Sequence, residues 1–495
     1  MPEISLASQP EVFVSTSALS KAAGAAVARG ELRKIGSRLY TRNLTDDPEQ
    51  LVRRSWYFLI SSYFPDALIA DRTALENKPA ADGSVFLVSE GTREVELPGL
   101  TFRPRKGPPA TDSDRIFPGG ARLSSIPRAY LENMTPSRGR GGRVSRTLNR
   151  DEIEQRLDAL ARQQGEPALN KLRDDARALA GPLGLDAQFE ELSALIGTFL
   201  GTRDVKTQSA VGAARAAGNP FDPDRLELFE QLFSGLRDFV PSDRSTRGRS
   251  AEATANLAFY EAYFSNFNEG TEFSVDEAKE IVFEGVIPAE RPEDAHDILG
   301  TFRIVSDVAE MSRLPANAED FIDLLQERHA RIMEGRPDKQ PGQFKKKGNQ
   351  AGNTIFVIPD LVRGTLDKGF GFVDALGEPL QRAIFMMFLV SEVHPFVDGN
   401  GRVARAMMNA ELVAGGQERI IIPTAYRIDY LGALKAISQN KLADPVIRTL
   451  DLAQRYTHLI DWAQMTTAQT MLEETDAFAE GELARLKIPT DDAQP

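Results

Sequence analysis

The stretch from His394 to Arg405, HPFVDGNGRVAR, constrains the fold of this 495-residue chain more than any other. The largely apolar stretch 381–390 before it predicts a helix, and Pro395 ends that helix because proline has no backbone N–H to continue it. Phe396 is expected to turn inward and anchor the loop. A second helix is predicted to begin near Gly399, so the stretch is expected to form a helix, a short loop and a helix.

The residue types in this stretch suit a phosphate. Gly399–Gly401 leaves the backbone free to point successive N–H groups at an anion, and the positive end of the second helix faces the same place. Arg402 and Arg405, three residues apart in the first turn, can both point to it. Asp398 supplies a hard oxygen for Mg²⁺ and His394 supplies an imidazole. The pattern therefore predicts a phosphate-handling site rather than an ordinary glycine-rich turn.

Composition narrows the remaining chemistry. The chain has no cysteine, which excludes disulfides, thiolate metal sites and cysteine nucleophiles. Apart from His394, the histidines are His296 in an expected acidic loop and His329 and His458 on expected helices, without zinc-ligand spacing. The formal charge of −13 argues against nucleic-acid binding by the whole molecule and leaves a local basic patch open.

Nothing in the sequence predicts attachment to a membrane. Residues Met1–Ser15 are neither basic nor continuously apolar, unlike a signal peptide. The longest apolar run, Ala383–Val390, is too short to span a bilayer. A cytoplasmic location with no membrane partner is expected.

The N-terminal residues 1–45 are predicted to form a winged-helix-like segment. Residues 15–44 contain six basic side chains and a single acidic one, Glu31. A helix is expected from about Ser17, a second helix at 25–29, and then a hairpin. This arrangement favours a winged helix-turn-helix that binds DNA, and a small solvated helical cap is the alternative.

The next segments mix helix and strand. Residues 46–136 predict a small α/β unit, with a helix at Leu51–Phe64 and strands at Ser84–Ser89 and Glu94–Phe102. Residues 137–150 carry five arginines and no acid, and predict a mobile basic linker or exposed loop.

The rest of the chain is predicted to be mostly helical. Residues 151–239 are expected to form a helical domain and 251–440 a helical core, interrupted by a hairpin flap at 341–360. Residues 441–495 are expected to be a C-terminal helical region. The predicted fold class is mainly α, with a β-hairpin flap on the core, preceded by the winged-helix-like segment and the α/β unit.

The stretch from His394 to Arg405 matches the Fic family signature, H-x-F-x-[D/E]-G-N-G-R-x-x-R. The resemblance covers about residues 251–440 and implies a helical core with a flap over the site. It implies transfer of AMP from ATP, with Mg²⁺, to a Ser, Thr or Tyr hydroxyl of a target protein or of the chain itself. Gly401 before Arg402 favours nucleotidyl transfer over phosphorylation.

The resemblance assigns roles residue by residue. His394 resembles the general base, because an imidazole with a pKa of about 6.5 can accept a proton near neutral pH. Asp398 resembles the Mg²⁺ ligand, and Asn400 with its flanking glycines resembles the anion hole. Arg402 and Arg405 resemble the clamps on the β- and γ-phosphates. Further nucleotide-binding candidates are Gly352, Asn353 and Thr354 in the flap, and Tyr430.

Two details concern substrates. A flap strand would align the target protein by β-augmentation. Ser438 stands where some relatives of the Fic family have an asparagine that contacts adenine, so the base preference is left open.

Upstream, Ser265-Asn-Phe-Asn-Glu269-Gly270 resembles the inhibitory motif of the family, [S/T]-x-x-x-E-[G/N]. It would lie at the end of a helix at about 252–270 that packs on the core. The resemblance implies that Glu269 pairs with Arg405 in the place of the γ-phosphate. An ordinary helix end capped by Gly270 is the alternative interpretation.

Three hypotheses about function follow. The first is an autoinhibited protein adenylyltransferase. The second is a DNA-linked regulator whose core senses nucleotide, since residues 1–200 resemble, in pattern only, abortive-infection-type antitoxins with a winged helix. The third is a hydrolase that removes AMP from a modified protein, with Glu269 orienting the attacking water.

Overall fold

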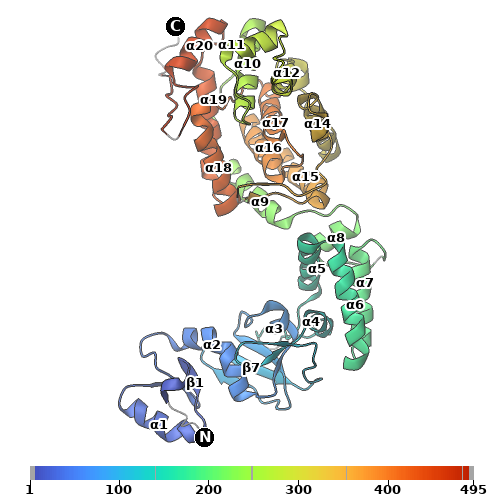
Figure 1. Ribbon diagram of the computed structural model, residues 1–495, viewed down its shortest axis with the longest axis vertical. Helices are drawn as coiled ribbons and strands as arrows, with labels where there is room; N and C mark the ends of the chain where they lie inside the picture. The colour runs from blue at the N-terminus through green and yellow to red at the C-terminus, as the bar shows by residue number, and fades with distance from the viewer. Residues whose placement is uncertain are drawn as a thin grey trace. The chain divides into compact units, whose positions relative to one another are not determined.

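The computed structural model describes residues 6–139, 141–203, 205–246, 249–352, 354–481 and 483–489. The chain divides into two compact units, Met1–Gly218 and Asn219–Pro495, drawn from blue to green and from green to red in Figure 1. Helices predominate, so the predicted mainly α fold class is confirmed. In the part of the chain that the structure describes, no helix combines the length and apolarity needed to cross a bilayer.

The first unit begins with one helix on a small antiparallel sheet. The sheet pairs in the order β1-β3-β2, and the elements are β1 (Val12–Val14), α1 (Ser17–Ala28), β2 (Arg33–Gly36) and β3 (Leu39–Thr41). The predicted hairpin is confirmed. The second helix predicted at 25–29 is wrong: alanines carry α1 through that stretch because alanine has the highest helix propensity. The described residues 6–45 therefore lack the recognition helix of a helix-turn-helix.

A mixed six-stranded sheet follows in the first unit. In pairing order its strands are β6 (Val95–Leu97), β7 (Leu100–Arg105), β5 (Ser84–Val88), β4 (Leu68–Ile69), β9 (Arg122–Leu123) and β8 (Arg115–Ile116). Its helices are α2 (Pro48–Tyr63), α3 (Asp71–Glu76) and α4 (Ile126–Asn133). The single strand predicted over 94–102 is two strands, because Gly99 takes a φ of 62° and turns the chain back.

In the arginine-rich stretch 137–150, residues 138–139 and 141–143 are exposed, as the exposed-loop alternative predicted. The stretch lies inside the first unit rather than linking two units, and its arginines pair with that unit. Arg143 pairs with Glu94 at 3.1 Å, and Arg146 pairs with Asp71 at 2.8 Å. These side chains neutralise carboxylates of the same unit, which explains why a stretch without acids of its own is held in place.

Four helices complete the first unit: α5 (Arg150–Gln164), α6 (Glu166–Leu183), α7 (Asp186–Phe199) and α8 (Ala210–Ala216). The helical domain predicted over 151–239 spans the boundary between the units. Its last helix, α9 (Pro223–Asp238), lies in the second unit, where the ring of Phe229 contacts those of Phe385 and Phe388. Apolar contacts therefore place α9 with the core that follows it.

The second unit is a helical core around two central helices, α16 (Pro379–Val393) and α17 (Asn400–Ala414), which lie side by side in Figure 1. Around them lie α10 (Ala251–Phe267), α12 (Pro292–Val305), α14 (Ala318–Ile332), α15 (Pro359–Asp374), α18 (Arg427–Asn440) and α19 (Asp444–Leu459), with α20 (Met465–Glu474) on α10. Almost every residue of α16 is buried, as expected of a helix that is apolar all round.

The second unit also tests the predictions of a flap and of an acidic loop around His296. The flap is present as a short antiparallel hairpin, β10 (Gln350–Ala351) with β11 (Thr354–Ile355). The acidic loop predicted around His296 is wrong, because those residues form the first turns of α12. Proline at the start and acids in the first turn both favour a helix N-terminus there.

Candidate active site

The predicted helix, loop and helix form as expected. His394 ends α16 in the left-handed region, with φ 52° and ψ 59°, and Pro395 follows it. Gly399 precedes α17 with a φ of 72°, and a Cβ at this position would lie 2.5 Å from Met333 Sδ. Both the backbone angle and the close approach therefore require glycine at this position.

The side chain of Asn400 braces the loop. Phe396 is fully buried, its N–H donates to Asn400 Oδ1 at 2.8 Å, and its carbonyl accepts from Asn400 Nδ2 at 3.0 Å. The amide of Asn400 thus has loop partners on both sides, and any contribution to anion binding falls to backbone N–H groups at the start of α17.

His329 supports the same loop from α14. Its ring stacks on Phe396, with centroids 3.6 Å apart and planes 3° from parallel. Its Nδ1 accepts from the N–H of Gly342 at 2.9 Å, so the proton is on Nε2, which donates to the carbonyl of Asp398 at 2.9 Å. Burial lowers the pKa of His329 to about 4, so the ring is a neutral structural support.

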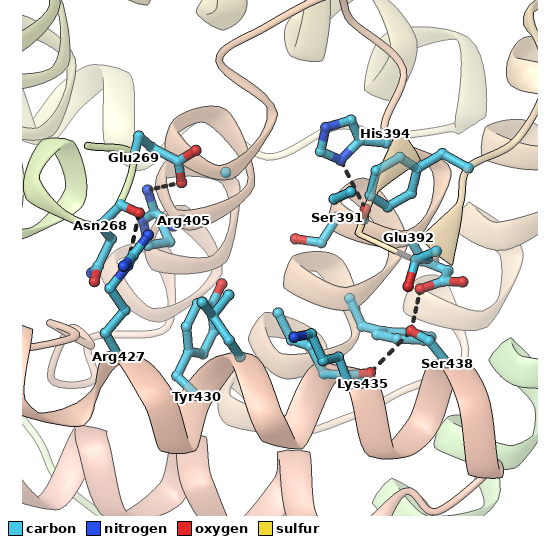
Figure 2. A pocket seen from close by; sticks show the side chains of 17 residues that line it. Asn268, Glu269, Ser391, Glu392, His394, Arg405, Arg427, Tyr430, Lys435 and Ser438 are labelled. Carbon is cyan, nitrogen blue, oxygen red and sulfur yellow. Dashed lines mark hydrogen bonds and ion pairs between the residues drawn. The ribbon is translucent and has the colours of Figure 1, made fainter. Parts of the chain in front are cut away.

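A cavity of about 280 Å³ opens beside the loop (Figure 2). The predicted site residues that line it are Glu269, Thr354, His394, Gly401, Arg405 and Tyr430. In Figure 2, Glu269 and Arg405 lie at one end, and Glu392 and Ser438 lie at the other.

Arg405 is held by the end of α10. Its Nε donates to Ser265 Oγ at 3.0 Å, and its Nη2 donates to the Ser265 carbonyl at 2.7 Å and to Glu269 Oε1 at 2.8 Å. Gly270 closes the helix end, with its N–H on the carbonyl of Phe267 at 3.0 Å. The predicted pairing of Glu269 with Arg405 is therefore present, Ser265 is a further partner, and the helix-cap interpretation of Gly270 holds alongside.

The imidazole of His394 is covered by the flap. The ring of Phe356 stacks on it at 3.8 Å and 5°, and His394 Nδ1 lies 3.3 Å from the Ser391 carbonyl. Loss of hydration lowers the pKa of His394 from 6.5 to about 4. A carbonyl can only accept, so this contact places the proton on Nδ1 and leaves Nε2 as the basic nitrogen of a neutral ring.

Residues 320–412, from α14 to α17 with the whole loop, match the sequence model of the Fic/DOC family. This chain contains a Fic domain. Protein adenylyltransferase Fic of Drosophila melanogaster is 25% identical over 279 residues, which are 54% of this chain and 55% of that protein. Protein adenylyltransferase fic-1 of Caenorhabditis briggsae is 25% identical over 198 residues, 38% of each chain. The chain thus spans about half the length of the first relative and less of the second.

Among solved structures, a Fic domain containing signaling protein from Bacteroides thetaiotaomicron covers 49% of this chain and 97% of its own, at 16% identity and a TM-score of 0.39.

Arg402 of the Fic domain is held away from the cavity. Its Nη1 lies 2.5 Å from Asp297 Oδ2 on α12, and its Nη2 lies 3.6 Å from Asp398 Oδ1. Arg336 also contacts Asp297, at 2.8 Å. Burial raises the pKa of Asp297 in spite of both arginines. In this arrangement Arg402 steadies Asp398 rather than lining the cavity with Arg405.

The carboxylate of Asp398 is suited to hold a Mg²⁺ ion that would take its other ligands from a substrate and water. Its Oδ1 accepts from the N–H of Gly399 at 2.7 Å, and its side chain is 40% exposed. The described residues contain no cluster of three or more metal-ligating side chains. Mg²⁺ commonly uses one or two carboxylates together with substrate phosphates and water, so a single exposed carboxylate suits it.

Lys345 fixes the backbone around His394 through hydrogen bonds. It is buried, and its Nζ donates to the His394 carbonyl at 2.8 Å and to Asn349 Oδ1 at 2.5 Å. Asn349 Nδ2 in turn donates to the Phe396 carbonyl at 3.0 Å. Burial lowers the pKa of Lys345 to about 7. These contacts tie the base of the flap to the loop that follows His394.

The nucleotide-binding candidates in the flap differ in their position relative to the cavity. Thr354 lines the cavity, and Gly352 lies in the hairpin turn with a φ of 56°. Asn353 lies outside the described residues. Tyr430 is buried under the cavity, with its hydroxyl 3.6 Å from Met387 Sδ.

Sequence patterns missed several residues that shape the site. These are Asp297, His329, Lys345, Phe356 and Glu392, each brought in by packing. The sequence analysis placed His329 on a helix and gave it no role, and Lys345 belongs to a run of three lysines that looks exposed. The signal available for Lys345 was its place within the stretch predicted to form the flap.

Proposed function

We propose that this protein transfers AMP from ATP to a hydroxyl side chain of a target protein, and that Glu269 holds it inactive. The observation that carries the proposal is the position of Arg405: it lines the same cavity as His394, and Glu269 contacts it at 2.8 Å. The names of the curated relatives support the transferase activity.

The chemistry requires one base and an anion site. The target hydroxyl oxygen attacks the α-phosphorus, the bond from that phosphorus to the β-phosphate oxygen breaks, and pyrophosphate leaves. Nε2 of neutral His394 takes the hydroxyl proton. Arg405 and the backbone at Gly401 bind the phosphates, where positioning and charge stabilisation are the main catalytic terms. Asp398 would hold Mg²⁺, which when bound supplies positive charge to the phosphates.

The proposed brake is electrostatic. Glu269 takes the place that a γ-phosphate would need beside Arg405, so ATP is excluded from a productive position. Holding about 99% of molecules inactive requires a bias of roughly 2.7 kcal/mol. A charge-assisted hydrogen bond contributes roughly 1.5–3 kcal/mol, which matches that need.

The test is incorporation of label from α-labelled ATP into protein of a cell lysate. Glu269→Gly is expected to raise incorporation by roughly tenfold to a hundredfold. Adding His394→Ala should abolish it, and Glu272→Gly, an exposed glutamate three residues away, should leave the wild-type level unchanged. If Glu269→Gly stays at the wild-type level, the brake is refuted.

Removal of AMP from a modified protein is the second candidate, because the Glu269 carboxylate lines the cavity and could orient a water there. Glu269→Gly separates the two activities: a transferase gains activity and a hydrolase loses it. A DNA-binding regulator has less support, since the described residues 6–45 contain a single α-helix.

A further inference from the structure

The end of the cavity away from Arg405 has its own polar group. Figure 2 places Glu392 and Ser438 there, opposite Glu269 and Arg405. Phosphates and base lie at opposite ends of a nucleotide. If phosphates bind at Arg405, as the proposed function requires, the base reaches Glu392.

Glu392 presents a buried acceptor at this end. It lies in the last turn of α16, is 3% exposed, and its Oε2 accepts from Ser438 Oγ at 2.5 Å. Its Oε1 is 2.8 Å from Nη1 of Arg225 on α9 but has no aligned hydrogen bond from any described residue. Burial raises the pKa of Glu392, and the Arg225 guanidinium and the Ser438 hydroxyl offset only part of that rise.

The cavity also has apolar walls. Leu431, Leu434 and Phe388 are among the residues that line it. Apolar walls with a few convergent polar groups are typical of small-ligand sites and suit the faces of a planar ring. A buried acceptor without an aligned donor is costly, so the edge of that ring should bring an N–H.

We propose that Glu392, oriented by Ser438, is a specificity-determining residue that accepts a hydrogen bond from an exocyclic amino group of the nucleobase. An ionised carboxylate only accepts, so it attracts an amino group and repels a ring carbonyl at the same place. Bases without an amino group leave Glu392 Oε1 with only its misaligned contact to Arg225 and should bind more weakly.

The test uses two nucleotide pairs that differ by one amino group each. ATP is compared with purine riboside triphosphate, and GTP with ITP, by calorimetric binding to the full chain carrying Glu269→Gly. The pair whose amino group is recognised should differ in affinity by roughly tenfold or more. Glu392→Ala should bring that ratio close to one, and Ser438→Ala, which keeps the carboxylate, should reduce it. Glu227→Ala, at a surface ion pair with Lys441, should leave it unchanged.

The outcomes are distinct. Equal affinities within both pairs before any change at Glu392 would overturn the inference, and this measurement needs no further variant to fold. A ratio that survives Glu392→Ala, or an equal loss for all four nucleotides, would assign Glu392 a purely structural role with Arg225. If no triphosphate binds at all, the proposed function fails and this inference fails with it.

Discussion

The carboxylate of Glu269 lies where a side chain on Gly401 would begin. A Cβ at position 401 would be 2.0 Å from Glu269 Oε1 and 3.1 Å from Arg405 Nη1. Glycine at this position lets the Glu269 carboxylate approach both the start of α17 and the guanidinium. If the carboxylate stands in for a phosphate, the same space serves the nucleotide.

Gly401→Ala tests that shared space. In a Glu269→Gly background the carboxylate is gone, and the added methyl group should still exclude the phosphate. We expect ATP affinity to fall by roughly tenfold, the usual scale of overpacking. Calorimetric titration of both proteins measures this. Gly432→Ala on α18, where a Cβ would have no neighbour within 4 Å, is the matched control. Unchanged affinity would mean that Glu269 and the phosphate occupy different places.

Ser265→Ala should release the brake in part. The change removes the hydroxyl on Arg405 Nε but keeps the Ser265 carbonyl and Glu269 on Nη2. Loss of one hydrogen bond predicts incorporation of label roughly two- to tenfold above wild type, below that of Glu269→Gly. Thr254→Ala, which removes another hydroxyl from α10, should have no effect. Activation equal to that of Glu269→Gly would show that Ser265 controls the position of Glu269.

Phe356→Leu should move the pH dependence of transfer. In the proposed reaction His394 acts as a base when neutral, and lost hydration lowers its pKa from 6.5 to about 4. In the Glu269→Gly protein, kcat/KM depends on neutral His394 and should therefore stay constant as the pH is lowered to about 5. Removing the stacked ring admits water and should raise the pKa of His394, so that activity falls at a higher pH.

Histidine proton NMR provides a second measurement of the same shift. The chain has four histidines, and His394→Ala assigns the signal. Phe344→Leu, which removes a ring that contacts Phe396 rather than His394, is the control. An unmoved titration in Phe356→Leu would refute the role of the stack.

His329→Asn should destabilise the second unit. It removes the stack on Phe396 and the contact with the Asp398 carbonyl, and we expect a loss of about 2–4 kcal/mol in the free energy of unfolding. Urea unfolding followed by Trp462 fluorescence in a Trp56→Phe background reports on this unit. His458→Asn, at a side chain that is 34% exposed, should cost little.

The same variant carries a pH signature. Because the folded-state pKa of His329 is about 4, below its ordinary value of 6.5, the unfolded chain binds the proton first as the pH falls between these values. Stability should therefore decrease on acidification through that window, and His329→Asn should make the decrease shallower. An identical pH dependence in both proteins would contradict the burial argument.

The helix, loop and helix around His394 could be predicted from sequence because its causes are local. Pro395 stops α16, and glycine allows the φ of 72° at Gly399. Because α16 is apolar on all sides, its burial could be predicted without knowing which elements pack on it. The contact of Arg405 with Glu269 was expected from two short motifs. Where local signals were weak, a prediction failed: alanines joined two expected helices into α1. For 137–150 the exposed loop was predicted, but the ion pairs of its arginines with carboxylates elsewhere in the unit were not.

The sequence by itself determined the loop between α16 and α17 and the flap, because prolines, glycines and apolar periodicity act within a few residues. Only the tertiary structure decided which polar side chains support that loop. Asp297 on Arg402, His329 on Asp398 and Lys345 on His394 join residues 49 to 105 positions apart. A single sequence does not encode those pairings locally, since burial of a charge becomes favourable only when packing brings its partner to hydrogen-bonding distance.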